Sequence, residues 1–227
     1  MYANADGQKS RRALATCKMP DLRFDAARVG KFARVMPDQL VCKWESKHRQ
    51  AGAFTAILDK PVGGTSAIMA FDAESDSLIG IGLVPDTVDL NQSLWNQPSW
   101  CIRQSSTGAS GGGPGMDEMF LDEKVIGHTG MWFGVARKSL LLVWRQGEAD
   151  RCTAALYVDF KKLGNGGGFV VPAGYTHFAI CGRQGVKVQL RPELAAEAEG
   201  ELARGEESFN VWLDSKRKSS GGCCLIA

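Results

Sequence analysis

The residues best suited to chemistry stand at the end of the chain, in the sequence Cys223-Cys224-Leu225-Ile226-Ala227. Cys224 is fourth from the terminal carboxylate and two aliphatic residues follow it, which is the C-a-a-X pattern that prenyltransferases modify. The transferase's zinc turns the thiol into a thiolate, and the aliphatic side chains fill the enzyme's exit pocket. We therefore expect a prenyltransferase to attach farnesyl or geranylgeranyl to Cys224, followed by removal of the residues after it and by methylation.

Two further signals for membrane attachment precede this thiol. Cys223 is a candidate for palmitoylation, and Lys216, Arg217 and Lys218 form a basic run. A single lipid chain gives only marginal membrane residence, whereas each basic residue near an anionic leaflet adds about 1 kcal/mol. The tail resembles those of small GTPases of the Ras and Rab type. From about residue 215 it is predicted to be flexible and to lie at the cytoplasmic leaflet of a membrane.

Other patterns that could support catalysis are absent. The glycine-rich stretches GASGGGPG and GNGGG lack the Lys-Ser/Thr pair and the helix of a phosphate-binding loop. The letters G-x-S-x-G occur only within the first of these stretches, a glycine-rich loop without the strand and helix of a nucleophile elbow, and there is no H-E-x-x-H. His128 and His177 have no carboxylate or cysteine at ligand spacing, and the acidic pairs at 117–118 and 122–123 are merely neighbours in sequence. We predict no catalytic residues, no metal, and no cofactor besides the covalent lipids.

The length suits one domain of generous size or two small ones, and the use of cysteine indicates a reducing compartment. The chain has 227 residues, of which 44% are hydrophobic, and a formal net charge of +2 without a broad basic field, so we expect no nucleic-acid partner. It has seven cysteines and no C-x-x-C, which argues against disulfides and structural zinc. Cys42, Cys152 and Cys181 lie in apolar stretches and are expected to be buried. We find no secretory signal and no apolar run long enough to span a membrane.

The elements that position these residues are predicted to be short strands separated by glycine clusters and turn dipeptides. The gaps are too short for the crossover helices of a parallel sheet, so the pattern predicts an all-β antiparallel sandwich or barrel. The one predicted helix covers 192–204, with Pro192 at its start. Phe209, Val211 and Trp212 are expected to dock on the body. The predicted strands are 40–45, 53–58, 66–71, 78–84, 99–104, 130–136, 139–145, 153–160, 177–181 and 185–190.

Several of these segments together resemble a SPRY domain. They are IGIGLV at 79–84, SWCIR at 99–103, VIG at 125–127, and LLVWRQGE at 141–148, followed by a closing hairpin in HFAICGRQGVKVQL. The chain departs from the usual pattern at Glu123-Lys124, where the family has Gly-Asp, at Gln146, where it has Asn, and at the entry strand SAIMAFDA. The resemblance implies a curved, concanavalin-like sandwich of two antiparallel sheets that binds proteins through loops at one end, without catalysis.

Loop residues on that scaffold are the candidates for partner contact, because tryptophan and arginine commonly anchor interfaces. The alternative is that Trp100 and Trp132 are core aromatics and that the charged residues only solvate the surface. We divide the chain into an extension (1–30), the sandwich (31–191), a helix and docking segment (192–214) and a lipidated tail (215–227). The candidates are Lys47, His48 and Arg49 in a hairpin between the first strands, and Trp95, Asn96, Trp100 and Arg103.

The sequence thus predicts a non-catalytic adaptor that binds a protein or peptide and is tethered to the cytoplasmic face of a membrane. Alternatives are a lectin-like sugar-binding sandwich, a soluble SPRY-type substrate-recognition module, and a carrier of apolar ligands. The carrier would need a hollow barrel. An adaptor subunit of a ubiquitin ligase would need a docking motif, which the acidic, alanine-rich helix sequence PELAAEAEGELAR does not provide.

Overall fold

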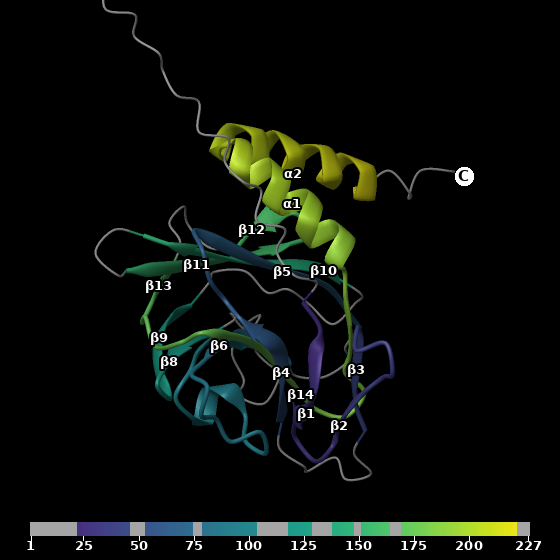
Figure 1. Cartoon of the computed structure of the whole chain (residues 1–227), viewed down its shortest axis with the longest axis vertical. Helices are drawn as coiled ribbons and strands as arrows, with labels where there is room; N and C mark the ends of the chain where they lie inside the picture. The colour runs from purple at the N-terminus through teal and green to yellow at the C-terminus, as the bar shows by residue number, and fades with distance from the viewer. Residues whose placement is uncertain are drawn as a thin grey trace, which may run out of the picture.

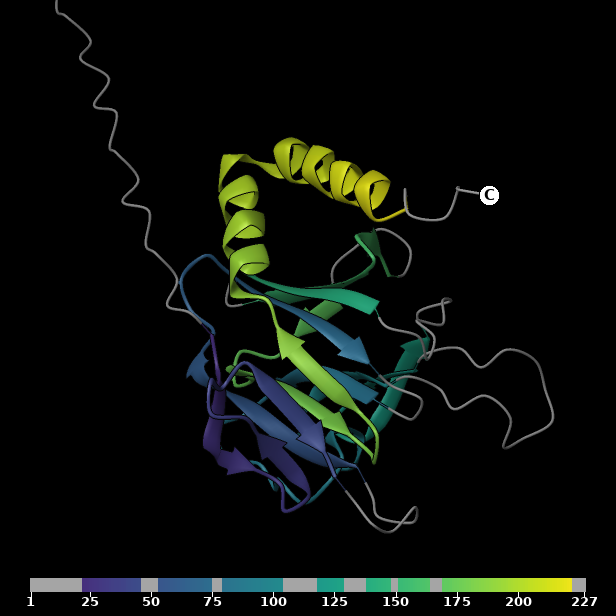
Figure 2. The ribbon, with the colours of Figure 1, turned by 90° about the vertical axis from the view of Figure 1, so that its right-hand side faces the viewer.

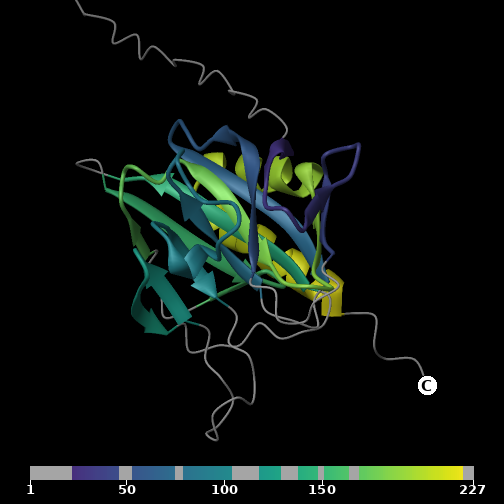
Figure 3. The ribbon, with the colours of Figure 1, turned by 90° about the horizontal axis from the view of Figure 1, so that it is seen from below.

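The described part of the chain folds into two antiparallel β-sheets packed face to face, with two helices on the outer side of one sheet (Figure 1). This arrangement confirms the predicted all-β sandwich. Seen from below in Figure 3, both helices lie behind the sheets. The computed structural model describes residues 22–45, 53–74, 79–103, 118–128, 138–147, 151–163 and 169–221.

Within the described residues, the first sheet has seven strands in the order β1-β4-β14-β6-β7-β8-β9. β8 and β9 are joined by the two residues Asp122 and Glu123, both with positive φ, which suits a tight hairpin turn. The strands are β1 (Phe24–Val29), β4 (Phe54–Pro61), β6 (Ile79–Val84), β7 (Trp100–Arg103), β8 (Glu118–Leu121), β9 (Lys124–His128) and β14 (His177–Gly182).

The second sheet has eight strands in the part of the chain that the structure describes. Seven of them follow the order β12-β11-β10-β5-β15-β3-β2, and β13 pairs with β11. β5 and β10 lie at its centre and pair along nearly their whole length. The strands are β2 (Ala33–Val35), β3 (Val41–Trp44), β5 (Ser66–Glu74), β10 (Lys138–Gln146), β11 (Cys152–Val158), β12 (Lys161–Lys162), β13 (Phe169–Val171) and β15 (Lys187–Leu190).

Alternate residues of both sheets fill the space between them. Ile81 and Leu83 of one sheet and Phe71 and Leu142 of the other belong to the same buried cluster. Trp100 is also part of this cluster and is fully buried. Because side chains occupy the space between the sheets, the sandwich is not the hollow barrel that an apolar-ligand carrier would need.

The outer faces of both sheets are also covered. This explains why the central strands are continuous apolar runs and do not alternate between apolar and polar residues. On the first sheet the segment between β6 and β7, with its short 3-10 helix η1 (Leu94–Asn96), covers Cys101 and Ala179. On the second sheet the two helices cover Ile68 and Leu141. The molecule therefore has four layers, of which the two sheets are the inner pair.

Helix α1 (Pro192–Arg204) has the predicted bounds, but a second helix, α2 (Glu206–Gly221), was not predicted. α2 runs at a steep angle to α1 across the top of the sandwich (Figure 2), and Gly205 between them has a φ of 125°. Two of the predicted docking residues, Phe209 and Trp212, are buried, whereas Val211 is 65% exposed. The prediction of a flexible tail from about 215 is therefore wrong for residues 215–221.

Nine of the ten predicted strands coincide with strands of the structure, and the tenth, 130–136, lies outside the described residues. The sandwich begins earlier than predicted, because β1 belongs to the first sheet. Two expected hairpins are wrong. β3 and β4 belong to different sheets, and so do β14 and β15, so that the chain crosses the sandwich at both places.

Helix α1 also seals part of a strand edge. β15 pairs with β5 only as far as Phe71. Beyond that point, residues at the start of α1 and within it accept or donate the hydrogen bonds of the β5 edge. The backbone N–H of Arg191 donates to the carbonyl of Ala70 at 2.8 Å, and the N–H of Ile68 donates to Glu199 Oε1 at 3.3 Å. Burial raises the pKa of Glu199, and the hydrogen bond from Ile68 opposes this effect only in part.

We expect Glu199→Gln to raise the melting temperature at neutral pH. A carboxyl with a raised folded-state pKa stabilises the protein while protonated, and that contribution is lost as pH rises through the folded-state pKa. Glutamine keeps the acceptor without the buried charge, so the two melting curves should converge near the ordinary glutamate pKa of about 4.3. Melting curves at several pH values, with exposed Glu45→Gln as control, test this. An equal gap at every pH contradicts it.

Candidate interaction surfaces

The segment between β6 and β7 forms an ordered cap on the first sheet. Gln97 is buried; its Oε1 accepts from the backbone N–H of Asp89 at 2.8 Å, and its Nε2 donates to the carbonyl of Gln92. The Ser99 hydroxyl donates to the carbonyl of Leu94 at 2.5 Å. These internal hydrogen bonds hold η1 against the sheet, so side chains that leave this cap have fixed positions.

Two of the predicted partner-contact residues lie inside the protein. Trp100 is fully buried between the sheets, and Trp95 is 6% exposed beneath the cap. The expectation that their side chains contact a partner is wrong, because β7 directs the Trp100 ring into the core and η1 lays the Trp95 ring on the sheet. Asn96, by contrast, is exposed. Lys47, His48 and Arg49 lie outside the described residues.

Arg103 joins this cap to the neighbouring hairpin. Its guanidinium lies 5.2 Å from the ring centroid of Trp95 and 4.7 Å from that of Phe120, and it forms an ion pair with Glu118, its cross-strand partner. A cation above two aromatic faces and beside a carboxylate is held in one orientation. Among the predicted contact residues that the structure describes, Arg103 and Asn96 are thus the two that reach solvent from a rigid base.

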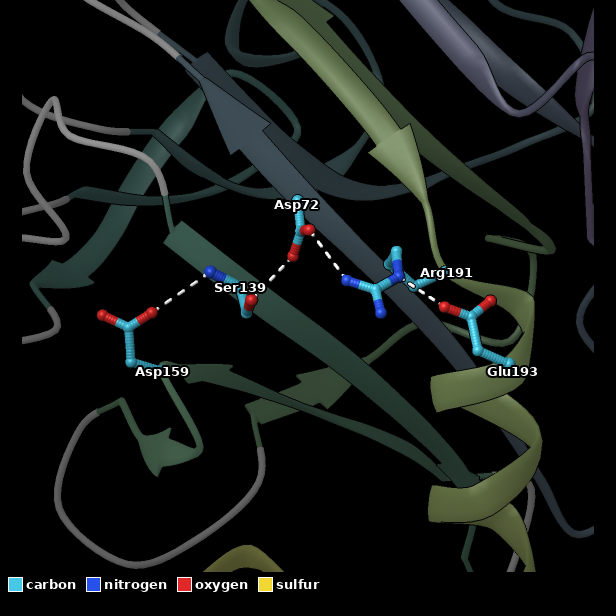
Figure 4. Close-up of polar contacts among 5 residues, drawn as sticks. All are labelled: Asp72, Ser139, Asp159, Arg191 and Glu193. Atoms are coloured by element: carbon cyan, nitrogen blue, oxygen red, sulfur yellow. Dashed lines mark hydrogen bonds and ion pairs between the residues drawn. The ribbon is translucent and has the colours of Figure 1, made fainter. Parts of the chain in front are cut away.

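A polar network on the outer face of the second sheet was not predicted (Figure 4). The Ser139 hydroxyl donates to Asp72 Oδ1 at 2.6 Å, and the Arg191 guanidinium donates to Asp72 Oδ2 at 2.9 Å and to Glu193. The backbone N–H of Ser139 donates to Asp159 Oδ1 at 3.1 Å. Hydrogen bonds to Glu193 and Asp72 raise the pKa of Arg191. The network fastens the start of α1 to β5 and β10.

This network contains a serine and a carboxylate but not the geometry of a catalytic triad. The Ser139 hydroxyl points its proton at Asp72, and no imidazole stands between them among the described residues. His177 belongs to β14 of the other sheet. Among the described residues, no group of three or more histidine, cysteine or acidic side chains is arranged to hold a metal ion. The network can therefore position a helix but shows no means of activating a nucleophile.

His177 has a carboxylate nearby in the fold, although none stands at ligand spacing in the sequence. Its Nε2 lies 3.9 Å from Asp86 Oδ1, which also forms an ion pair with Arg28 at 3.2 Å. Burial lowers the pKa of His177, and the positive charge of Arg28 lowers it further, against the opposing effect of Asp86. The imidazole is therefore neutral near pH 7 and packs as a buried side chain.

The structure also contains a cleft that the sequence did not reveal. It has a volume of about 640 Å³ and lies between α2 and the outer face of strands β10, β11 and β12. Its residues come from stretches far apart in the chain, so no local pattern marks them. The side chains that line it are Val143, Arg145, Thr153, Ala155, Tyr157, Phe160, Lys161, Lys162, Glu206, Asn210, Leu213, Asp214 and Arg217.

The chain is therefore a two-sheet antiparallel sandwich with a structured cap on one side and a helical pair on the other. No family model matches its sequence, and no curated protein matches it. A crystal structure of the TRIM65 PSpry domain is similar, with a TM-score of 0.56 and 10% identity over 76% of this chain and 90% of that one. A human SPRY domain has a TM-score of 0.48 and 14% identity over 71% and 96%.

Because the sequence identities are this low, the similarity to these structures concerns the fold alone. The similarity to the TRIM65 domain, which spans most of both chains, shows that this protein has the SPRY type of β-sandwich. The resemblance drawn from the sequence motifs is confirmed at that level. The IGIGLV and SWCIR segments form the adjacent strands β6 and β7, and VIG lies in β9.

Proposed function

We propose that this protein is a non-catalytic, protein-binding adaptor with a SPRY-type sandwich, tethered to the cytoplasmic leaflet of a membrane by a prenyl group on Cys224. The SPRY-type fold supports the protein-binding part of the proposal. The partner-facing surface is the rigid cap on the first sheet, where Asn96 and the stacked Arg103 reach solvent. Such preorganised side chains lose little conformational entropy when a protein or peptide binds.

The observation that carries the tethering part is that α2 ends at Gly221, three positions before Cys224. Six residues follow the helix, and six residues extend at most about 20 Å, which leaves a prenyltransferase room to bind the last four. A lipid on Cys224 would hold the sandwich close to the leaflet, because α2 is packed on the folded body. No helix in the described ranges is both long and apolar enough to cross a membrane.

The basic run contributes less to membrane attraction than three isolated cations would. Lys216 forms an ion pair with Glu197 at 2.8 Å, and Arg217 forms one with Asp214 at 3.0 Å. These carboxylates offset part of the positive charge near the end of α2. A single prenyl chain needs a second signal for stable residence, so a palmitoyl group on Cys223 becomes the more important one.

Prenylation predicts a specific covalent mass. We expect the protein from eukaryotic cells to carry one farnesyl or geranylgeranyl group, to lack the residues after Cys224, and to pellet with membranes. Cys224→Ser should have the unmodified mass and should be soluble, while Cys223→Ser should keep the prenyl group and bind membranes more weakly. Intact-mass spectrometry and membrane fractionation measure both. An unmodified wild type that stays soluble would leave a soluble SPRY-type recognition module.

A further inference from the structure

The cleft under α2 is built so that one helix face opposes one sheet face. Glu206, Asn210, Leu213, Asp214 and Arg217 line it from α2, and their spacing of three or four residues places them along a single stripe. From the sheet, Val143 and Arg145 of β10 and Thr153, Ala155 and Tyr157 of β11 line it. Its volume of about 640 Å³ lies within the usual range for small-molecule sites.

A strained turn brings the third wall into place. β11 and β12 are joined by Asp159 and Phe160, whose φ angles of 46° and 63° are unusual for a bulky residue such as Phe160. The Phe160 ring packs edge-on against Trp212 at 5.9 Å. Lys162 pairs across the strands with Tyr157, so both side chains stand on the face that α2 covers.

The cleft gathers more positive than negative charge. Arg145, Lys161, Lys162 and Arg217 line it together with the carboxylates of Glu206 and Asp214. The carboxylates belong to α2, where Glu206 forms an ion pair with Arg145 and Asp214 with Arg217.

Like charges crowd the sheet side of the cleft. Burial lowers the pKa of Lys162, and the positive charge of Arg145 lowers it further. A bound anion would relieve this repulsion.

We propose that this cleft binds a phosphorylated polyol, such as an inositol phosphate that is free or forms the headgroup of a lipid. Lysine and arginine side chains bind phosphate oxygens through charge-assisted hydrogen bonds. The Glu206 and Asp214 carboxylates and the Asn210 amide accept hydrogen bonds from ring hydroxyls. The Tyr157 and Phe160 rings offer apolar surface to the ring carbons. A ligand that carried only phosphates would place its negative charge beside these carboxylates. Hydroxyl groups can donate hydrogen bonds to them, which is why they belong to the proposal.

This proposal does not depend on prenylation, so it is tested on the unlipidated full chain made in bacteria. Titration calorimetry measures binding of inositol trisphosphate, with myo-inositol and inorganic phosphate as comparison probes. Lys161→Gln combined with Lys162→Gln should weaken inositol trisphosphate binding about tenfold or more. Lys43→Gln combined with Lys124→Gln, which changes the net charge equally but lies outside the cleft, should leave it unchanged.

The source of the ligand is distinguished with vesicles. Binding to phosphatidylinositol bisphosphate vesicles that free inositol trisphosphate displaces indicates a lipid headgroup, whereas binding of the free compound alone indicates a soluble ligand; both support the cleft. Equal weakening by both double variants would overturn the proposal, because it would show unspecific charge attraction. Absence of binding at millimolar inositol trisphosphate, or equally tight binding of inorganic phosphate or a polyglutamate peptide, would also overturn it.

Discussion

Gly82→Ala is expected to prevent the sandwich from folding stably. A Cβ atom on Gly82 would lie 2.0 Å from the carbonyl oxygen of Trp100 and 2.7 Å from the Cα of Cys101. Both are backbone atoms of β7, the strand paired with β6, so no side-chain rotation relieves the clash. Separating the strands would break ladder hydrogen bonds in the middle of the sheet, and we expect a loss of about 3 kcal/mol or more. Urea denaturation followed by circular dichroism measures it.

Gly63→Ala is the matched control for this substitution. Nothing lies within 4 Å of a Cβ built on Gly63, and its φ is not in the left-handed region, so this variant should be as stable as wild type. If Gly82→Ala unfolds at the same urea concentration as Gly63→Ala, the close approach of β6 and β7 is not a requirement of the fold.

Close packing at these positions also explains the glycine pattern that drew attention in the sequence. Ile79, Ile81 and Leu83 face the core, so the glycines between them face outward beneath the cap. A Cβ on Gly80 would lie 2.9 Å from the Trp95 ring and 2.7 Å from Cys181 Sγ. The glycine in this motif therefore leaves the space that the buried Trp95 ring occupies above the strand, although the sequence alone suggested that Trp95 faces a partner.

Strands with both faces buried could be predicted, because their apolar runs do not depend on distant residues. β5, β6, β10 and β14 are of this kind. None of the strands that were missed is buried along its whole length, and none has more than six residues; they are β1, β2, β8, β9, β12 and β13. Their conformation depends on pairing with a neighbouring strand more than on their own pattern.

The helix α2 and the polar network could be anticipated only in part. Phe209, Trp212 and Leu213 recur at helical spacing, but the serine and lysine residues after them favoured an irregular tail. The ion pair between Asp72 and Arg191 joins residues 119 positions apart, and no pattern in a single sequence links them. An aspartate within an otherwise apolar strand was the one available signal, because a buried carboxylate requires a partner.

Phe209→Ala is expected to release α2 from the sandwich while both sheets stay folded. The Phe209 ring is fully buried, edge-on to Tyr157 at 5.7 Å and stacked on Trp212 at 5.7 Å. Truncating such a side chain costs about 3–5 kcal/mol. An isolated helix of this length is only marginally stable in water. Because the lost contact energy is larger than this intrinsic stability, we expect α2 to leave the sheet and unfold. Hydrogen exchange resolved by peptide should become fast over 206–221 and remain slow in β5, β6 and β14.

Val211→Ala provides the control, because Val211 is on the same helix and is 65% exposed. This variant should keep the slow exchange of α2, which separates a lost contact from a weakened helix. Simultaneous fast exchange in the helix and both sheets of Phe209→Ala would contradict the expectation and would make α2 part of the cooperative core. If α2 alone is released, the anchored helix and the basic cleft are lost together, because the same ring holds the helix that forms one wall of that cleft.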